Sequence, residues 1–133
     1  MLCGTPAVHE DRETGMKYML LIYGPAEGDW SDEAVQAEMN EYRAYEKAVV
    51  DAGVKMGSEA LQGIATATTV AVRADGERVV TDGPFAETRE VLGGYYLLDV
   101  PDLDAALDWA ARCPGSQNGN RIEVRPVLEF EEP

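Results

Sequence analysis

Apolar residues follow two different periods along this chain, and each change of period marks a new element. An unbroken apolar run over residues 19–23, ended by a Gly-Pro pair, predicts a strand covered on both faces. Over residues 31–52 apolar positions recur every three or four residues, which predicts a helix with Ser31 as N-cap and Gly53 as its left-handed end. We expect this helix to bury Val35, Met39, Tyr42, Tyr45 or Glu46, and Val49.

The middle of the chain predicts short strands and a β-hairpin. Residues 54–56 and 68–73 are short β-type runs. The stretch "TTVAVRADGERVVTD" has alternating β-formers on either side of Asp75 and Gly76, which is typical of a tight hairpin. An Asp-Gly-Pro-Phe turn at residues 82–85 then leads into "GGYYLLDV", a second largely apolar strand. The glycine pair at its start favours a bulge or a close backbone approach.

A second helix and a last strand complete the pattern. Asp102 suits the N-cap of the helix, and the Pro-Gly pair after Cys113 predicts its end. "RIEVRPV" alternates cleanly, and Pro126 within it predicts an edge strand. The expected apolar face of the second helix consists of Leu103, Ala106, Leu107 and Ala110.

The resulting order, β–α–β–hairpin–β–α–β, predicts an α+β fold: a ferredoxin-like split βαβ unit with an inserted β-hairpin. The two most apolar strands, at residues 17–23 and 94–100, each precede a helix, so we expect them in the centre of the sheet. Two helices cover only one face of such a sheet, and the other face is also apolar. We therefore predict a homodimer in which two sheets face each other.

Length and charge restrict the class of protein. The chain has 133 residues and a formal net charge of −14, which disfavours nucleic acid and anionic membrane surfaces as partners. No apolar run is long enough for a membrane span, and the first residues lack the pattern of a signal peptide, so a cytoplasmic protein is the default expectation. Residues 1–15 are polar and aperiodic, which predicts a disordered tail or a mis-assigned start before Met16.

The sequence lacks the motifs that bind a metal ion or a nucleotide, and it lacks those of a hydrolase triad. Cys3 and Cys113 are too few and too far apart for a disulfide framework or a metal motif, and we expect Cys113 to be a half-buried apolar residue. "VLGGYY" lacks the spacing of a nucleotide-binding loop, and "DGERV" lacks that of a calcium loop. The only histidine, His9, lies in the tail. We therefore expect no metal and no cofactor.

Five stretches of the sequence carry a family likeness. "MKYMLLIYG", "GSEAL", "ATATTVAVR", "VVTDGPFAETREVLGGYYLLDVPDLDAALDWAARCPG" and "IEVRPVLEF" resemble the YCII-related family, specifically its bacterial DGPF-motif branch. The likeness spans residues 16 to about 130, which we take as one domain. It implies a dimeric α+β barrel. Members of this branch are often encoded beside, or fused to, extracytoplasmic-function sigma factors, so the resemblance also implies a possible sigma-factor partner.

The resemblance does not supply a catalytic site. Some distant YCII-type proteins have a His–Asp pair in a cleft, similar to that of muconolactone isomerases. His9 lies outside the matched range, so a histidine-based dyad cannot be carried over to this chain.

The Asp-Gly-Pro-Phe turn has a structural and a functional interpretation. Asp82 can accept hydrogen bonds from nearby backbone N–H groups, and Phe85 could anchor the turn, which together would make a stiff corner. Alternatively, Asp82 presents its carboxylate at the edge of a cleft, and Phe85 and the charged residues behind the turn bind a small polar ligand. The charged residues concerned are Glu87, Arg89 and Glu90. We favour the structural interpretation.

Acid–base groups elsewhere in the domain offer a second candidate site. Tyr95 and Tyr96 must point to opposite faces of their strand, so one of them faces the space between the proposed sheets. A tyrosine such as Tyr95 and a carboxylate such as Glu59 could transfer protons in a buried pocket, with Tyr42 and Arg125 as ligand contacts. The alternative is that the tyrosines are amphipathic core residues and that Arg125 pairs with Asp82 or Glu59.

Two functions therefore stay open. The first is a small-molecule enzyme, or a degenerate one, of the isomerase or lyase type that transfers protons without a metal or nucleotide. The catalytic candidates are then Asp82, Glu59 and Tyr95. The second is a non-catalytic ligand-binding or regulatory dimer that works with a sigma factor, for which the acidic surface could meet a basic partner.

Overall fold

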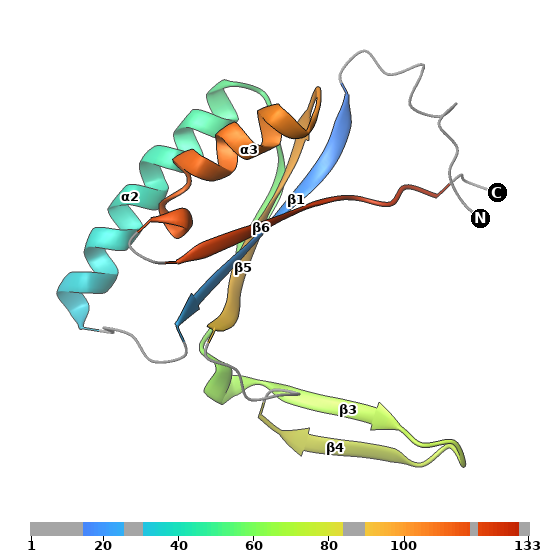
Figure 1. Ribbon diagram of the computed structural model, residues 1–133. Helices are drawn as coiled ribbons and strands as arrows, with labels where there is room; N and C mark the ends of the chain where they lie inside the picture. Colours follow the sequence, from blue (N-terminus) through green and yellow to red (C-terminus); the bar gives the residue numbers. More distant parts are fainter. Residues whose placement is uncertain (1–14, 26–30, 84–89, 118–119, 131–133) are drawn as a thin grey trace.

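The computed structural model describes residues 15–25, 31–83, 90–117 and 120–130 and shows a mixed α+β architecture (Figure 1). Within these ranges, two helices and six strands occur in the order β1–α2–β2–β3–β4–β5–α3–β6. Short 3-10 turns lie at Ile64–Thr66 and Pro114–Ser116. The bounds are β1 Met16–Pro25, α2 Asp32–Asp51, β2 Lys55–Ala60, β3 Thr68–Val72, β4 Arg78–Asp82, β5 Glu90–Val100, α3 Leu103–Arg112 and β6 Arg121–Pro126.

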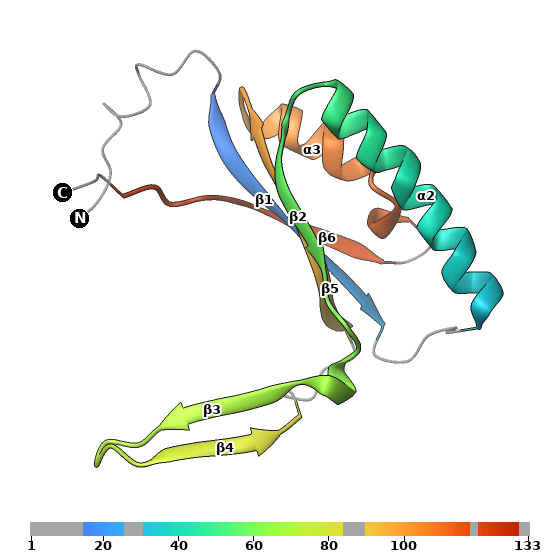
Figure 2. The ribbon, with the colours of Figure 1, turned by 180° about the vertical axis from the view of Figure 1, so that it is seen from behind.

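The main sheet has four antiparallel strands in the order β2-β5-β1-β6. The central position of β1 and β5 and the edge position of β6 confirm the predicted order and fit a ferredoxin-like arrangement. Both helices lie on one face of this sheet, as the opposite views in Figures 1 and 2 show. No helix among the described residues is long and apolar enough to cross a membrane.

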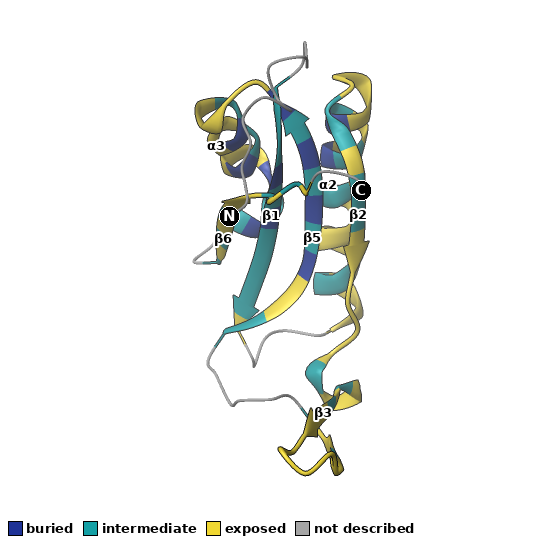
Figure 3. Ribbon diagram, turned by 90° about the vertical axis from the view of Figure 1, so that its right-hand side faces the viewer, coloured by how far each residue is buried: buried dark blue, intermediate teal, exposed yellow. Residues whose placement is uncertain are grey.

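The hydrophobic core lies between the helices and the sheet. Leu20, Leu98, Val49, Val100 and Cys113 are the largest side chains that are fully buried there. Strand β5 alternates between buried and intermediate residues from Gly94 to Val100, as the period of a half-buried strand requires (Figure 3). Strand β1 does so only around its buried residues Tyr18 and Leu20.

The helix ends form as predicted. Ser31 Oγ accepts a hydrogen bond from Ala34 N at 3.2 Å, and Asp102 accepts one from Ala105 N, so both predicted N-caps are confirmed. Gly53 has a φ of 75°, a conformation that favours glycine, and follows directly after the C-cap of α2.

The predicted buried faces of the helices are partly wrong. Leu103 and Leu107 are 46% and 45% exposed, because the face of α3 against the sheet runs through Ala106 and Ala110 toward Cys113. Leu107, one position after Ala106, and Leu103, three positions before Ala106, therefore turn to the flank of the helix. Met39 is also exposed, because burial in α2 is confined to Tyr45 and Val49 in its C-terminal half.

The glycine pair at the start of the second apolar strand shapes the pairing of the sheet, as predicted. Ile22 of β1 pairs with Gly94, but Tyr23 pairs with Leu92, so Gly93 is the extra residue of a bulge. A Cβ on Gly94 would lie 2.7 Å from the carbonyl oxygen of Glu59, so the strands β2 and β5 need glycine there.

The predicted hairpin is the two-stranded sheet β3–β4, which extends away from the body of the molecule (Figures 1 and 2). Gly83, at its base, donates its N–H to Ala67 O at 2.8 Å and accepts a hydrogen bond from Thr69 Oγ1 at 2.8 Å. The φ of Gly83 is 104°, which side chains rarely tolerate. These features agree with a stiff corner at the start of the Asp-Gly-Pro-Phe turn.

Candidate functional site

The four-stranded sheet has one face without helices, which we call the open face. In β1 the buried Tyr18 and Leu20 point toward the helices, so the residues between them point to the open face. The strand registers carry this assignment across the sheet. The open face then contains Lys17, Met19, Leu21, Tyr23, Gly57, Glu59, Glu90, Leu92, Tyr95, Leu97, Asp99, Arg121, Glu123 and Arg125.

Candidate polar groups and apolar side chains share rows across this face. One row runs through Glu59, Tyr95, Leu21 and Glu123, which are successive cross-strand partners. The next row runs through Gly57, Leu97, Met19 and Arg125. The open face is therefore apolar in its centre, with carboxylates and an arginine on the edge strands.

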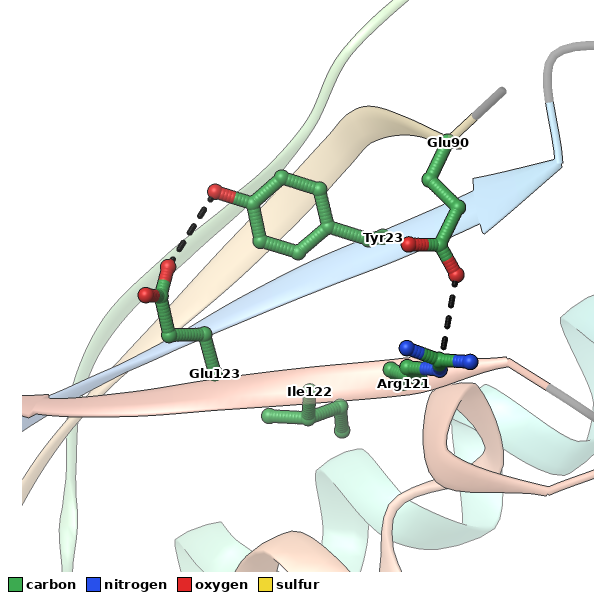
Figure 4. A pocket seen from close by; sticks show the side chains of 5 residues that line it. All are labelled: Tyr23, Glu90, Arg121, Ile122 and Glu123. Atoms are coloured by element: carbon green, nitrogen blue, oxygen red, sulfur yellow. Dashed lines mark hydrogen bonds and ion pairs between the residues drawn. The ribbon is translucent and has the colours of Figure 1, made fainter. Parts of the chain in front are cut away.

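An open hollow of about 420 Å³ lies at one end of this face (Figure 4). Tyr23, Glu90, Arg121, Ile122 and Glu123 line it, and they come from strands β1, β5 and β6. The hydroxyl of Tyr23 donates a hydrogen bond to Glu123 Oε1 at 3.3 Å, and Arg121 Nε lies 3.6 Å from Glu90 Oε2. The hollow thus combines a tyrosine–carboxylate pair with an ion pair.

The electrostatics of the hollow keep Tyr23 protonated. Partial burial, followed by the charge of Glu123 and the hydrogen bond to it, raises the pKa of Tyr23, while the charge of Arg125 acts in the opposite direction. Tyr23 is therefore a hydrogen-bond donor at neutral pH, and Glu123 is its acceptor.

Glu59, Tyr95 and Arg125, which the sequence indicated, all lie on the open face, and Tyr95 is the cross-strand partner of Glu59. Arg125 forms no ion pair with Asp82 or Glu59 within the described part of the chain. Asp82 is exposed at the end of β4, in the hairpin.

Tyr42 lies on the other side of the sheet. Its hydroxyl accepts a hydrogen bond from Cys113 Sγ at 3.9 Å and lies against Gly115, where an added Cβ would come within 2.7 Å of it. Burial, followed by the neighbouring thiol, raises the pKa of Tyr42. Cys113 is fully buried and not half-buried as expected, because it ends α3 directly above the sheet. The candidate residues therefore do not gather in one pocket.

Three ligand-binding candidates, Phe85, Glu87 and Arg89, lie outside the described residues. Within the described ranges, no three or more His, Cys, Asp or Glu side chains group in a way that could hold a metal ion.

Sequence reasoning missed Tyr23, Arg121 and Glu123. The signal for two of them was present: the alternation that put Arg125 opposite Ile122 and Val124 also puts Arg121 and Glu123 there. Tyr23 was missed because it lies in an apolar run, in which the sequence indicates no partner for its hydroxyl.

Comparison with known proteins identifies the family. The model of the YCII-related domain matches residues 16–131, a range that contains every described strand and helix. An uncharacterized protein of Rhizobium meliloti (strain 1021) is 37% identical over 119 residues, which cover 87% of this chain and 95% of that relative. The chain therefore belongs to the family of YCII-related domain proteins.

Proposed function

We propose that this protein is a homodimer in which two open faces meet and enclose a small-molecule site. The centre of the open face is formed by Met19, Leu21, Tyr95 and Leu97, and no other part of the described chain packs over it (Figures 1 and 2). A second sheet about 10 Å away would remove these side chains from water and close the hollow, which is otherwise open to solvent.

Charge supports a second copy as the occupant. The whole chain carries 25 acidic and 11 basic residues, and α2 alone carries six acidic and two basic ones. The open face instead has four acidic and three basic side chains, which nearly balance. An acidic protein can pair with itself only through a face of this kind, because like charges directly opposite repel. The acidic residues are Glu59, Glu90, Asp99 and Glu123, and the basic ones are Lys17, Arg121 and Arg125.

The hollow supports an enzyme of the proton-transfer type, and the pair of Tyr23 and Glu123 is the observation that carries this function. Glu123 would take a proton from the carbon beside a carbonyl group, and the Tyr23 hydroxyl would donate a hydrogen bond to the developing enolate oxygen. Return of the proton to another carbon gives an isomerised product without any co-reactant. Arg121 would hold a carboxylate of the substrate.

Glu59 and Tyr95 would extend the site across the face. Neighbouring strands lie about 4.8 Å apart, so Tyr95 on β5 is about 10 Å from Glu123 on β6. That distance excludes direct contact but suits a small ligand that spans the apolar centre. Asp82 belongs to the hairpin and has no place in this site.

Deuterium exchange tests the chemistry. Small carbonyl compounds with a carboxylate would be incubated with the protein in D₂O, and uptake of deuterium beside the carbonyl would be followed by NMR. We expect Glu123→Gln to abolish uptake and Tyr23→Phe to slow it about 100-fold. Glu38→Gln, an equivalent change on the exposed side of α2, should leave the rate unchanged. Equal rates in Glu123→Gln and the unmodified protein would contradict this mechanism.

The acidic helix surface favours a second function, in which the dimer binds a basic segment of an extracytoplasmic-function sigma factor. Six acidic residues against two basic ones on α2 would attract such a segment through a field that salt screens. Pull-down with the sigma factor encoded nearest the gene tests this. Recovery that falls with salt and with the double substitution Glu38→Gln and Glu41→Gln is expected, and failure to recover any sigma factor would contradict it.

A further inference from the structure

We propose that the hairpin β3–β4 is a clasp that packs its valine side against a second copy of this chain. The clasp consists of Thr68–Val72 and Arg78–Asp82, and it rests on the dimer proposed above. The proposal assigns a role to a part of the chain that contributes nothing to the core of its own protomer.

The exposed valines of the clasp carry the proposal. Val70 and Val80 are direct cross-strand partners, so they lie on the same side, together with Val72 two residues along. Their exposed fractions are 58%, 59% and 67%, although β-branched side chains of this kind are usually buried. A side of a strand pair that carries three adjacent apolar side chains needs a surface to cover it.

The contacts within the clasp are too few to keep it folded by themselves. Among the described residues, β3 and β4 pack extensively only on each other, and neither packs extensively on a helix or on the four-stranded sheet. An isolated two-stranded hairpin is only marginally stable in water. The hydrogen bonds of Gly83 with Ala67 and Thr69 close the base of the clasp itself. The clasp extends away from the four-stranded sheet (Figures 1 and 2).

The direction of the clasp indicates the second copy as its occupant. In both Figures 1 and 2 the clasp extends from the sheet on the side away from the helices, which is the side of the open face. The segment after β6 extends to the same side, and its Leu128 and Phe130 are 58% and 72% exposed. A partner seated on the open face would lie between these two projections and contact both.

The area of the open face gives a second reason. The strands β1, β2, β5 and β6 have 10, 6, 11 and 6 residues, which gives the sheet a planar area of about 540 Å², whereas a stable interface covers about 800 Å² on each partner. One side of a hairpin with five residues in each strand adds about 160 Å². Each protomer would contribute its own clasp and the surface under the partner's clasp, which brings the total to about 860 Å². The sheet alone is too small, and the clasps supply the difference.

Sedimentation equilibrium of the full chain tests the clasp. We expect the double variant Val70→Ser and Val80→Ser to weaken dimerisation about 100-fold, because four valine side chains of each dimer lose their contacts. Circular dichroism should show the same fold in the variant. Leu107→Ser removes an equally accessible apolar side chain from the outer side of α3 and should leave the dimer constant unchanged.

A photo-crosslinking amino acid at Val72 gives a second readout in a chain that keeps the other two valines. Cross-linked dimers support the clasp if they form when position 72 is labelled and do not form when position 107 is labelled instead. A dimer that forms no cross-link at position 72, or one that the double variant leaves at full strength, overturns the clasp while the facing sheets stand. A chain that stays monomeric at micromolar concentration overturns both.

Discussion

The two faces of the four-stranded sheet use similar side chains for different purposes. Leu98 and Tyr96 of β5 are buried against the helices, while Leu97 and Tyr95, their neighbours in sequence, are only partly covered on the open face. On the helix side the tyrosine hydroxyls have fixed partners: Tyr45 donates to Trp109 O at 2.8 Å and Tyr96 to Glu46 Oε1 at 3.2 Å.

The difference shows that only the helix-covered face has its packing partners within one chain. Under the helices, Tyr45 and Tyr96 also meet edge to face with their ring centres 5.1 Å apart, and Lys55 pairs with Glu46 at the border of the core. The open face combines an apolar centre with charged edges and an open hollow. The first face stabilises the fold, and the second is the face to which we assign the proposed partner and ligand.

Alkaline pH should distinguish the two faces most strongly. Burial, ahead of neighbouring charges, raises the pKa of Tyr42, Tyr45 and Tyr96, all on the helix side. Below pH 10 these tyrosines are protonated in both states, so their contribution is fully present. Above pH 10 they ionise in the unfolded chain first, and stability falls by up to about 1.4 kcal/mol per pH unit for each, or about 4 kcal/mol for three.

Urea unfolding between pH 8 and pH 12 would measure this slope, and absorbance near 295 nm would follow the ionisation of tyrosine. Tyr42→Phe and Tyr96→Phe should each remove about one third of the slope. A slope that neither substitution changes would show that these buried tyrosines do not cause the alkaline loss of stability.

Truncation of adjacent leucines should give the next largest contrast. Leu98→Ala removes a fully buried side chain and should lower the free energy of unfolding by about 3 kcal/mol. Leu97→Ala, on the open face, should cost about 1 kcal/mol or less in dilute protein, where the proposed dimer would be dissociated. Urea unfolding at several protein concentrations separates the two. Equal losses for both leucines in dilute protein would mean that the open face is a core surface of the monomer.

A smaller contrast is expected for single hydroxyl groups. Tyr96→Phe removes the hydrogen bond to Glu46 and should cost about 1 kcal/mol of stability. Tyr95→Phe should leave stability within about 0.5 kcal/mol, as for other surface changes, but should weaken binding of a ligand that spans the open face. Thermal unfolding and ligand titration by calorimetry would measure both effects. A stability loss in Tyr95→Phe as large as that in Tyr96→Phe would contradict the assignment of faces.

Local patterns predicted most of this fold because its elements carry local signals. The caps at Ser31 and Asp102, the glycine stop of α2 and the hairpin turn all depend on residues within a few positions of each other. The central position of β1 and β5 followed from their largely apolar runs, which indicate strands covered on both faces.

The site was less predictable because it depends on contacts between distant strands. Tyr23 meets Glu123, a hundred positions away, only after β1 and β6 have paired, and a bulge at Gly93 keeps Glu90 on the same face. The direction in which the hairpin extends from the sheet is also not indicated by any local sequence pattern (Figures 1 and 2).

The half-correct prediction for the buried face of α3 leads to the smallest predicted effect. Leu103, Ala106, Leu107 and Ala110 all fit one apolar stripe at helical spacing, so periodicity alone could not show that only the two alanines are buried. The structure chooses the alanines, so Leu107→Ala should change the free energy of unfolding by less than about 0.5 kcal/mol, since alanine also has the higher helix propensity. Ala110→Leu should cost at least about 1 kcal/mol, because the larger side chain would be forced into the packed contact between α3 and the sheet. Urea unfolding measures both variants. A large loss of unfolding free energy in Leu107→Ala would show that Leu107 is buried, as the sequence pattern predicted.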